Sequence, residues 1–409
     1  MPQNAEKTEG FIDYLYHSRK ILKESSLALF ITIITSVLAG IFLGGFRETL
    51  LLVPGLIILI PGTISMRGTI LGAMGSRLGS AFHLGLLKKF KLSDKLVLAN
   101  TFSTFLLSLY LSVILAVYAE ILAQLLGINS ISFFSLLTIS FFGSMLSMGI
   151  LIFLTFAVAF QAYSKGWDID NIHAPLVASF GDLVTVPSMF VAAMLLPVFE
   201  PYTLYISIAI LFVVGITLGH FLKTETMYEK IIKQSIIVLS FGAILSTSAG
   251  IILQHYIEAL VAIPSILVLL PAFIGEGGNI GSIFASRIAT HLHLGLVKPK
   301  FEIKGEAEKE ISHTYLFAII VFPIIAVTTY YLSKFAGIMS LHPITLILIS
   351  LAGGAILTTL VTFLAFGSSI ISFKHGIDPD NVLIPIVASS ADILGVVCLF
   401  VVLFVLGIL

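Results

Sequence analysis

The sequence predicts an all-α, polytopic membrane protein with about eleven transmembrane helices, and composition is the first reason. Of the 409 residues, 58% are hydrophobic and 11% are charged, and the mean hydropathy is +1.09. Soluble domains carry about 25% charged residues. So few charges cannot cover a water-soluble protein of this size, which excludes soluble enzymes, disordered chains and nucleic-acid-binding proteins. The single cysteine, Cys398, excludes a disulfide framework and a thiolate metal cluster.

The second reason is a series of apolar segments, each long enough to cross a bilayer. A helix needs about 20 apolar residues to span roughly 30 Å of hydrocarbon. The segments are residues 26–46, 50–84, 95–123, 131–162, 171–198, 202–222, 233–254, 260–294, 311–336, 343–373 and 381–408. The charged first 25 residues contain no apolar run, so they are not a signal peptide and are expected to form a cytoplasmic or interfacial segment.

The third reason is the distribution of positive charge between the segments. With the N-terminus in the cytoplasm, the inside segments hold 17 lysines and arginines, and the outside segments hold only Arg47 and Lys334. Cytoplasmic loops of membrane proteins carry such an excess. The bias predicts an N-terminus inside and a C-terminus outside, in a multi-pass protein of the cell membrane.

An internal repeat organises these segments. The stretch that starts at Pro61 and the one that starts at Pro271 share 10 of 26 residues, and those that start at Gly166 and Gly376 share 9 of 17. Both pairs are offset by 210 residues, and a constant offset marks a duplication almost free of insertions.

The duplication predicts a domain organisation. After the terminal segment 1–25, we expect a five-helix repeat at 26–200, a linking transmembrane helix and cytoplasmic loop at 201–232, and a second five-helix repeat at 233–409. The linking helix restores the orientation, so the repeats are parallel and equivalent residues can face each other at one depth, an arrangement known in transporters.

Asp182 and Asp392 are the strongest candidates for a site. They occupy the same repeat position, 11 residues after Asn171 and Asn381 respectively. At 1.5 Å per residue this places them about 16 Å along the helix, near mid-membrane. Two close carboxylates repel unless a cation or a shared proton lies between them. They either bind a hard cation such as Mg²⁺ or are structural carboxylates that are protonated or paired with arginine.

A second group of oxygen ligands is expected at the cytoplasmic ends of the same two helices. Each half carries a D-x-D-N sequence there, and Pro175 and Pro385 each free the carbonyl of the asparagine four residues back. The residues of the two sequences are Asp168, Asp170, Asn171, Asp378, Asp380 and Asn381. They either concentrate cations before entry or cap the helices, and both roles can hold together.

The glycine-rich second span adds Glu276 and Asn279, which can present oxygens to a central path. The first half has Met66 and Thr69 at these positions and carries Arg67, so the two halves are expected to line the path with different chemical groups. Arg67 is expected to pair with Glu276, to repel ions in an ungated state, or to form a local salt bridge. Arg77 and Arg287, which are repeat partners, are expected to reach lipid phosphates.

These motifs resemble those of the MgtE magnesium transporters. The resemblance rests on GxDPDN…P…ASxxD in the last span and P…GxxGN in the second span, and the double repeat with its linking span is similar to solute carrier family 41. It implies a five-span pore unit used twice to form a Mg²⁺ pathway, with Asp182 and Asp392 at its central site. Sensor domains of the kind that gate MgtE are absent from the sequence.

Two functions of different classes follow. The first is divalent cation transport, with Mg²⁺ as the transported ion and the bilayer as the other partner, by a chain that works as a monomer because its repeats supply both halves of the path. The alternative is a secondary transporter of an anionic metabolite, in which Arg67, Arg77 and Arg287 bind the anion and the aspartates are proton or sodium sites. An enzyme is not expected, because no H-E-x-x-H sequence or nucleophile constellation occurs.

Overall fold

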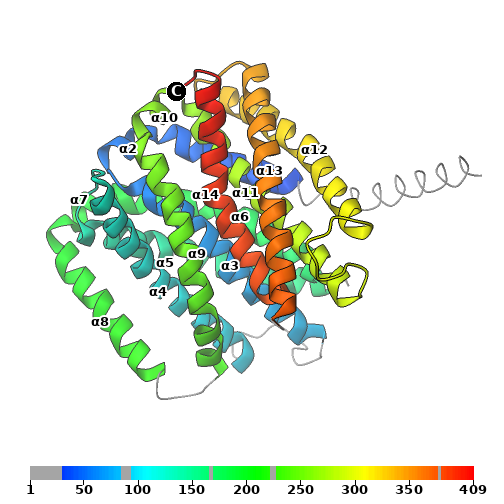
Figure 1. Ribbon diagram of the computed structural model, residues 1–409. Helices are drawn as coiled ribbons and strands as arrows, with labels where there is room; N and C mark the ends of the chain where they lie inside the picture. Colours follow the sequence, from blue (N-terminus) through cyan, green and yellow to red (C-terminus); the bar gives the residue numbers. More distant parts are fainter. Residues whose placement is uncertain (1–29, 84–93, 165–168, 222–226, 376–378) are drawn as a thin grey trace, which may run out of the picture.

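The computed structural model describes residues 30–83, 94–164, 169–221, 227–375 and 379–409, and all its regular elements are helices. A first helix at Phe30–Gly45 precedes the labelled elements of Figure 1. These elements are α2 (Arg47–Leu52), α3 (Leu56–His83), α4 (Lys95–Leu126), α5 (Phe133–Ser164), α6 (Ile169–Met194), α7 (Leu196–Phe199), η1 (Glu200–Tyr202), α8 (Thr203–Phe221), α9 (Met227–His255), α10 (Ile257–Ala262), α11 (Pro264–His293), α12 (Glu306–Phe335), α13 (Pro343–Lys374) and α14 (Pro379–Val405).

The polytopic, all-α fold class is confirmed. Within the described ranges, nine helices are long and apolar enough to cross a membrane. Two shorter apolar helices, Phe30–Gly45 and Phe180–Met194, lie where two more spans are predicted. The count of eleven spans and their orientation remain predictions.

The two predicted spans that start at residues 50 and 260 begin differently from the prediction. A short helix comes first in each half, α2 or α10, and the chain then breaks before the long helix at Val53 and at Ile263. Both residues precede a proline and have φ of −122°. The proline ring disfavours helical geometry in the residue before it, so the break occurs at the same repeat position twice.

The first helix of each half packs into the other half. Gly40 lies against the backbone of Val268 on α11, where an added Cβ would be 2.0 Å from the carbonyl oxygen. Its repeat partner Gly250 on α9 lies against the backbone of Ile58 on α3, at 2.3 Å for the same atoms. Only glycine permits such close helix contacts. The two first helices are therefore exchanged between the halves.

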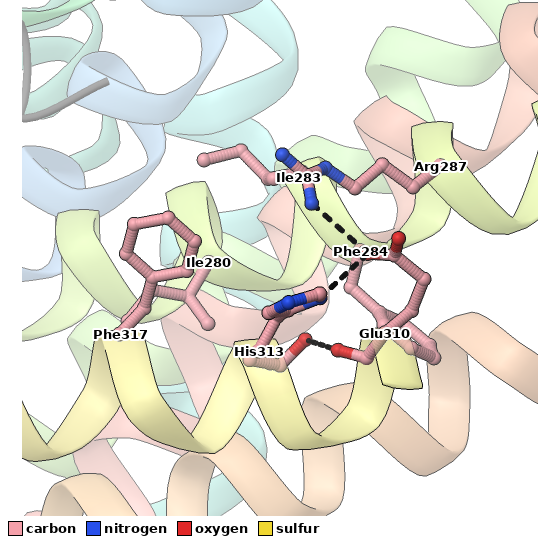
Figure 2. A pocket seen from close by; sticks show the side chains of 8 residues that line it. Ile280, Ile283, Phe284, Arg287, Glu310, His313 and Phe317 are labelled. Atoms are coloured by element: carbon pink, nitrogen blue, oxygen red, sulfur yellow. Dashed lines mark hydrogen bonds and ion pairs between the residues drawn. The ribbon is translucent and has the colours of Figure 1, made fainter. Parts of the chain in front are cut away.

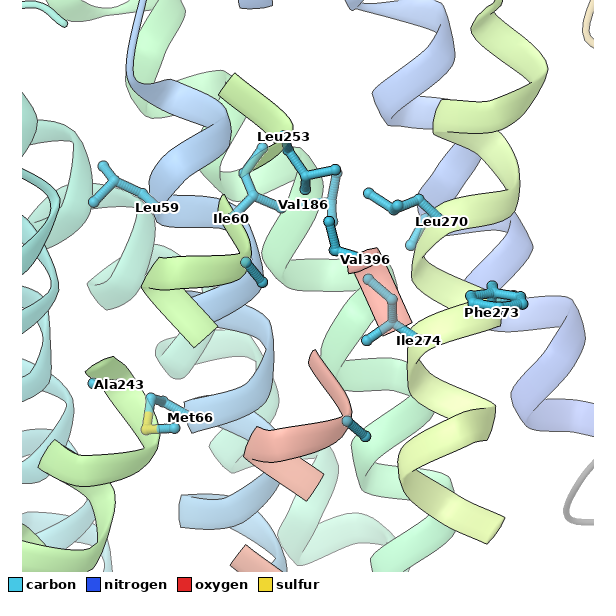
Figure 3. Packing of buried hydrophobic residues seen from close by; sticks show 14 of the residues in the cluster. Leu59, Ile60, Met66, Val186, Ala243, Leu253, Leu270, Phe273, Ile274 and Val396 are labelled. Atoms are coloured by element: carbon cyan, nitrogen blue, oxygen red, sulfur yellow. The ribbon is translucent and has the colours of Figure 1, made fainter. Parts of the chain in front are cut away.

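The exchange builds one continuous core at the centre of the bundle. Buried apolar side chains from both halves meet there, including Leu59 and Met66 on α3, Leu253 on α9, and Ile274 on α11 (Figure 3). The linking helix α8 contributes little to this core, because its apolar side chains are mostly exposed and it lies at the edge of the bundle (Figure 1). The last helices of the two halves, α6 and α14, lie inside the bundle and carry the predicted aspartates.

Candidate functional site

The two aspartates have equivalent hydrogen-bond partners. Asp182 on α6 accepts a 2.8 Å hydrogen bond at Oδ2 from Ser36 of the first helix. Asp392 on α14 accepts one at Oδ2 from Ser246 on α9. The two serines are repeat partners, and both are buried. In each half, therefore, the first helix donates a hydroxyl to the carboxylate of the last helix.

Ser36 and Ser246 are functional candidates that reasoning from the motifs missed. A single serine in an apolar helix gives no signal of its own. The signal becomes visible when the repeat is extended to the first span, where residues 34–40 read ITSVLAG and residues 244–250 read ILSTSAG. Both serine and glycine are retained, four residues apart on one face of the helix.

A third carboxylate, Glu276, lies close to Asp182. Both Glu276 and Asp392 interact electrostatically with Asp182. Gly275 marks the proximity, since a Cβ added to it would be 3.9 Å from Oδ2 of Asp182. Glu276 is buried on α11, where it accepts hydrogen bonds from Thr32 and, at 3.3 Å, from Asn279. The structure thus places Asp182, Asp392, Glu276 and Asn279 in one region of the bundle.

The site is asymmetric because the contact of Thr32 with Glu276 has no polar counterpart. At the equivalent positions stand Gly242 and Met66, and a Cβ added to Gly242 would be 2.9 Å from Cε of that methionine. Neither residue has a hydroxyl or a carboxyl group, so the hydrogen bond of Thr32 with Glu276 is not repeated in the other half. The negative charge of the site is concentrated beside Asp182.

Arg67 does not pair with Glu276, so this expectation was wrong, as was the alternative of a local salt bridge. Its buried guanidinium donates a 2.6 Å hydrogen bond through Nη1 to the backbone carbonyl of Ser144 on α5. Residue 67 is one helical step of about 100° from residue 66 and therefore faces α5 rather than the centre. Among the described residues, no carboxylate forms an ion pair with it.

Arg77 and Arg287 bind protein groups, which corrects the expectation that they reach lipid. Arg77 donates through Nε to Asn100 at 2.7 Å, and Arg287 forms a 3.0 Å ion pair with Glu310, the repeat partner of that asparagine. Figure 2 shows the second pair, with His313 beside it on α12. Both arginines therefore anchor the helix that follows the second span, α4 or α12.

Replacing Glu310 tests this anchor. Glu310→Ala leaves the partly buried Arg287 without its carboxylate and should lower the free energy of unfolding by about 1–3 kcal/mol. Glu310→Asn copies the Asn100 of the first half and should cost less. Thermal unfolding of the purified variants in detergent measures the difference, and equal losses would show that Arg287 does not need an acceptor at this position.

The predicted ligands at the cytoplasmic mouth cannot be placed. The side chains of Asp170, Asn171, Asp380 and Asn381 lie outside the described part of the structure, as do the residues Asp168 and Asp378. In the part that is described, no three His, Cys, Asp or Glu side chains come together closely enough to hold a metal ion.

Comparison with known proteins identifies the family of the chain. The family profile of MgtE, described as a divalent cation transporter, matches residues 60–192 and again residues 270–402, and it thus falls on both repeats at the same offset. Mouse solute carrier family 41 member 3 is 25% identical over 391 residues, which cover 87% of this chain and 77% of that protein.

Two further relatives are solute carrier family 41 member 2 of chicken and of human. They are 26% and 25% identical over 371 residues, which cover 83% of this chain and 62% of each relative. No solved structure matches the chain. The double match to the family profile covers well over half of the residues, and the chain is a multi-pass membrane protein that belongs to the MgtE family of divalent cation transporters.

Proposed function

We propose that the chain carries Mg²⁺ across the cell membrane along a path between its two halves, with Asp182 and Asp392 as the central ligands. The observation that carries the proposal is their equivalence. Each aspartate lies on the last helix of its repeat, accepts a hydroxyl from the same position of the first helix, and interacts electrostatically with the other. A duplication that preserves two partly buried carboxylates preserves a site for positive charge.

A pair of carboxylates suits a hydrated ion. Mg²⁺ releases its waters reluctantly and is usually held by one or two carboxylates together with several waters. Asp182 and Asp392 supply the two charges, Glu276 strengthens the field on one side, and Asn279 offers a neutral oxygen. The mouth residues Asp170, Asn171, Asp380 and Asn381 would bind the ion on its way to or from the cytoplasm.

The alternative of an anionic substrate has no observation in its favour. It requires Arg67 and Arg77 to face a substrate, whereas they donate to Ser144 and Asn100. The carboxylates at the centre would also repel an anion. We therefore retain the cation pathway alone.

Purified chain in liposomes that contain a Mg²⁺-sensitive dye tests the proposal. External Mg²⁺ should raise the signal in a saturable manner, and empty liposomes should not respond. A chain that moves no Mg²⁺ in either direction, with or without a membrane potential or a gradient of Na⁺ or H⁺, would refute the proposed substrate.

We also propose that the chain works as a monomer. The exchange of Gly40 and Gly250 contacts between the halves builds within one chain the interface that a single-repeat protein would need a dimer to form. Light scattering of the active protein in detergent should give the mass of one chain, 44.1 kDa, after the detergent is subtracted. An obligate dimer with transport lost on dilution would contradict this.

A further inference from the structure

The serines beside the aspartates have a feature that the proposed pathway does not explain. Ser36 and Ser246 both donate to Oδ2, and both are buried at the contact between the first and last helices of their halves. A hydroxyl on one carboxylate oxygen restricts rotation of the carboxylate and leaves the other oxygen, Oδ1, available to an ion.

The two halves differ in a second hydroxyl. The hydroxyl of Ser65 on α3 also lies beside Asp392, close enough to interact with its carboxylate. Its repeat partner is Gly275 on α11, which lies next to Asp182 and has no side chain to donate. Among the described residues, Asp392 thus has two hydroxyls beside it and Asp182 has one.

We propose that Ser36 and Ser246 are positioning residues for cation binding, an inference that rests on the proposed function. Transport depends on Ser36 more than on Ser246. Without Ser36, no hydroxyl in the described part of the chain orients the Asp182 carboxylate, and the ion must order it on binding. Without Ser246, the Ser65 hydroxyl still lies beside Asp392 and can orient it. The asymmetry follows from Ser65 and Gly275 alone.

The first experiment compares Ser36→Ala with Ser246→Ala in Mg²⁺ flux into liposomes. A hydrogen bond to a charged group contributes enough to change an equilibrium about tenfold, so Ser36→Ala should raise the KM for Mg²⁺ about tenfold and change the maximal rate much less. Ser246→Ala should raise the KM less. Adding Ser65→Gly to Ser246→Ala should bring its KM to the level of Ser36→Ala.

A serine in place of Gly275 should restore the hydroxyl that Asp182 loses in the Ser36→Ala variant. A Cβ at this position meets no atom closer than 3.9 Å, and that atom is Oδ2 of Asp182. Serine therefore fits and brings a hydroxyl to the carboxylate that has lost one. The double variant Ser36→Ala with Gly275→Ser should recover a KM near that of the parent, whereas Gly275→Ala, which fits equally well but donates nothing, should not.

The outcomes separate this inference from the proposed function. If Asp182→Ala transports Mg²⁺ normally, the central site is wrong. If Asp182→Ala is inactive but Ser36→Ala keeps the parental KM, only the positioning role is wrong, and equal effects of Gly275→Ser and Gly275→Ala would overturn it too. Should Ser36→Ala not yield folded protein, Gly275→Ser alone decides: it should lower the KM, and Gly275→Ala should not.

Discussion

Asp182→Ala and Asp392→Ala should each reduce Mg²⁺ transport by roughly two orders of magnitude, because each removes one of the two charges that we propose as the central ligands of the ion. Asp182→Asn and Asp392→Asn should lose transport to a similar degree, although they keep the size of the side chain and an oxygen that can accept from Ser36 or Ser246. Initial rates of dye-reported Mg²⁺ uptake into liposomes provide the measurement.

These losses should occur in folded protein. A partly buried carboxylate without its cation does not favour the folded state, so removing it should leave thermal stability in detergent unchanged or slightly raised. Glu308→Gln, a substitution at an exposed glutamate in the first turn of α12, is the control and should transport like the parent. Parental rates in both aspartate variants would mean that the ion does not pass this pair.

Gly40→Ala and Gly250→Ala should destabilise the protein by at least about 1–3 kcal/mol, the usual cost of overpacking a tight contact. The added methyl would overlap a backbone carbonyl of α11 or of α3, and backbone cannot move aside as a side chain can. The measurement is thermal unfolding in detergent, followed by the loss of a monodisperse elution peak.

Gly45→Ala in the same first helix is the matched control for Gly40→Ala, since an added Cβ there meets nothing within 4 Å. Gly72→Ala on α3 provides a second control for the same reason. If all four variants unfold at the parental temperature, the first helices are not exchanged between the halves. The main observation in favour of a core shared between the two halves would then be lost.

Sequence reasoning was strongest where the duplication could be used. The offset of 210 residues located Asp182 and Asp392 together, because two carboxylates in equivalent apolar spans stand out against their surroundings. It did not locate Ser36 and Ser246, because hydroxyls are common in membrane helices and only their contact with a carboxylate distinguishes them. The breaks at Val53 and Ile263 were missed because apolarity continues through them.

The sequence could not show how each helix is rotated about its own axis. Arg67 follows Met66, whose repeat partner Glu276 lies at the site, so a pairing of Arg67 with Glu276 was a reasonable hypothesis. One step along a helix turns a side chain by about 100°, and packing of α3 against α5 decides where it points. The exchange of first helices was equally invisible, because it depends on which half each glycine contacts.

The most direct test of the central claim is the position of the bound ion. Mn²⁺ has the same charge and oxygen preference as Mg²⁺ and can be located by its anomalous scattering. In crystals of the chain grown with Mn²⁺, we expect an anomalous peak between the carboxylates of Asp182 and Asp392, and its loss when Mg²⁺ is added in excess. A peak that lies elsewhere in the bundle, with no density between these two aspartates, would contradict the account.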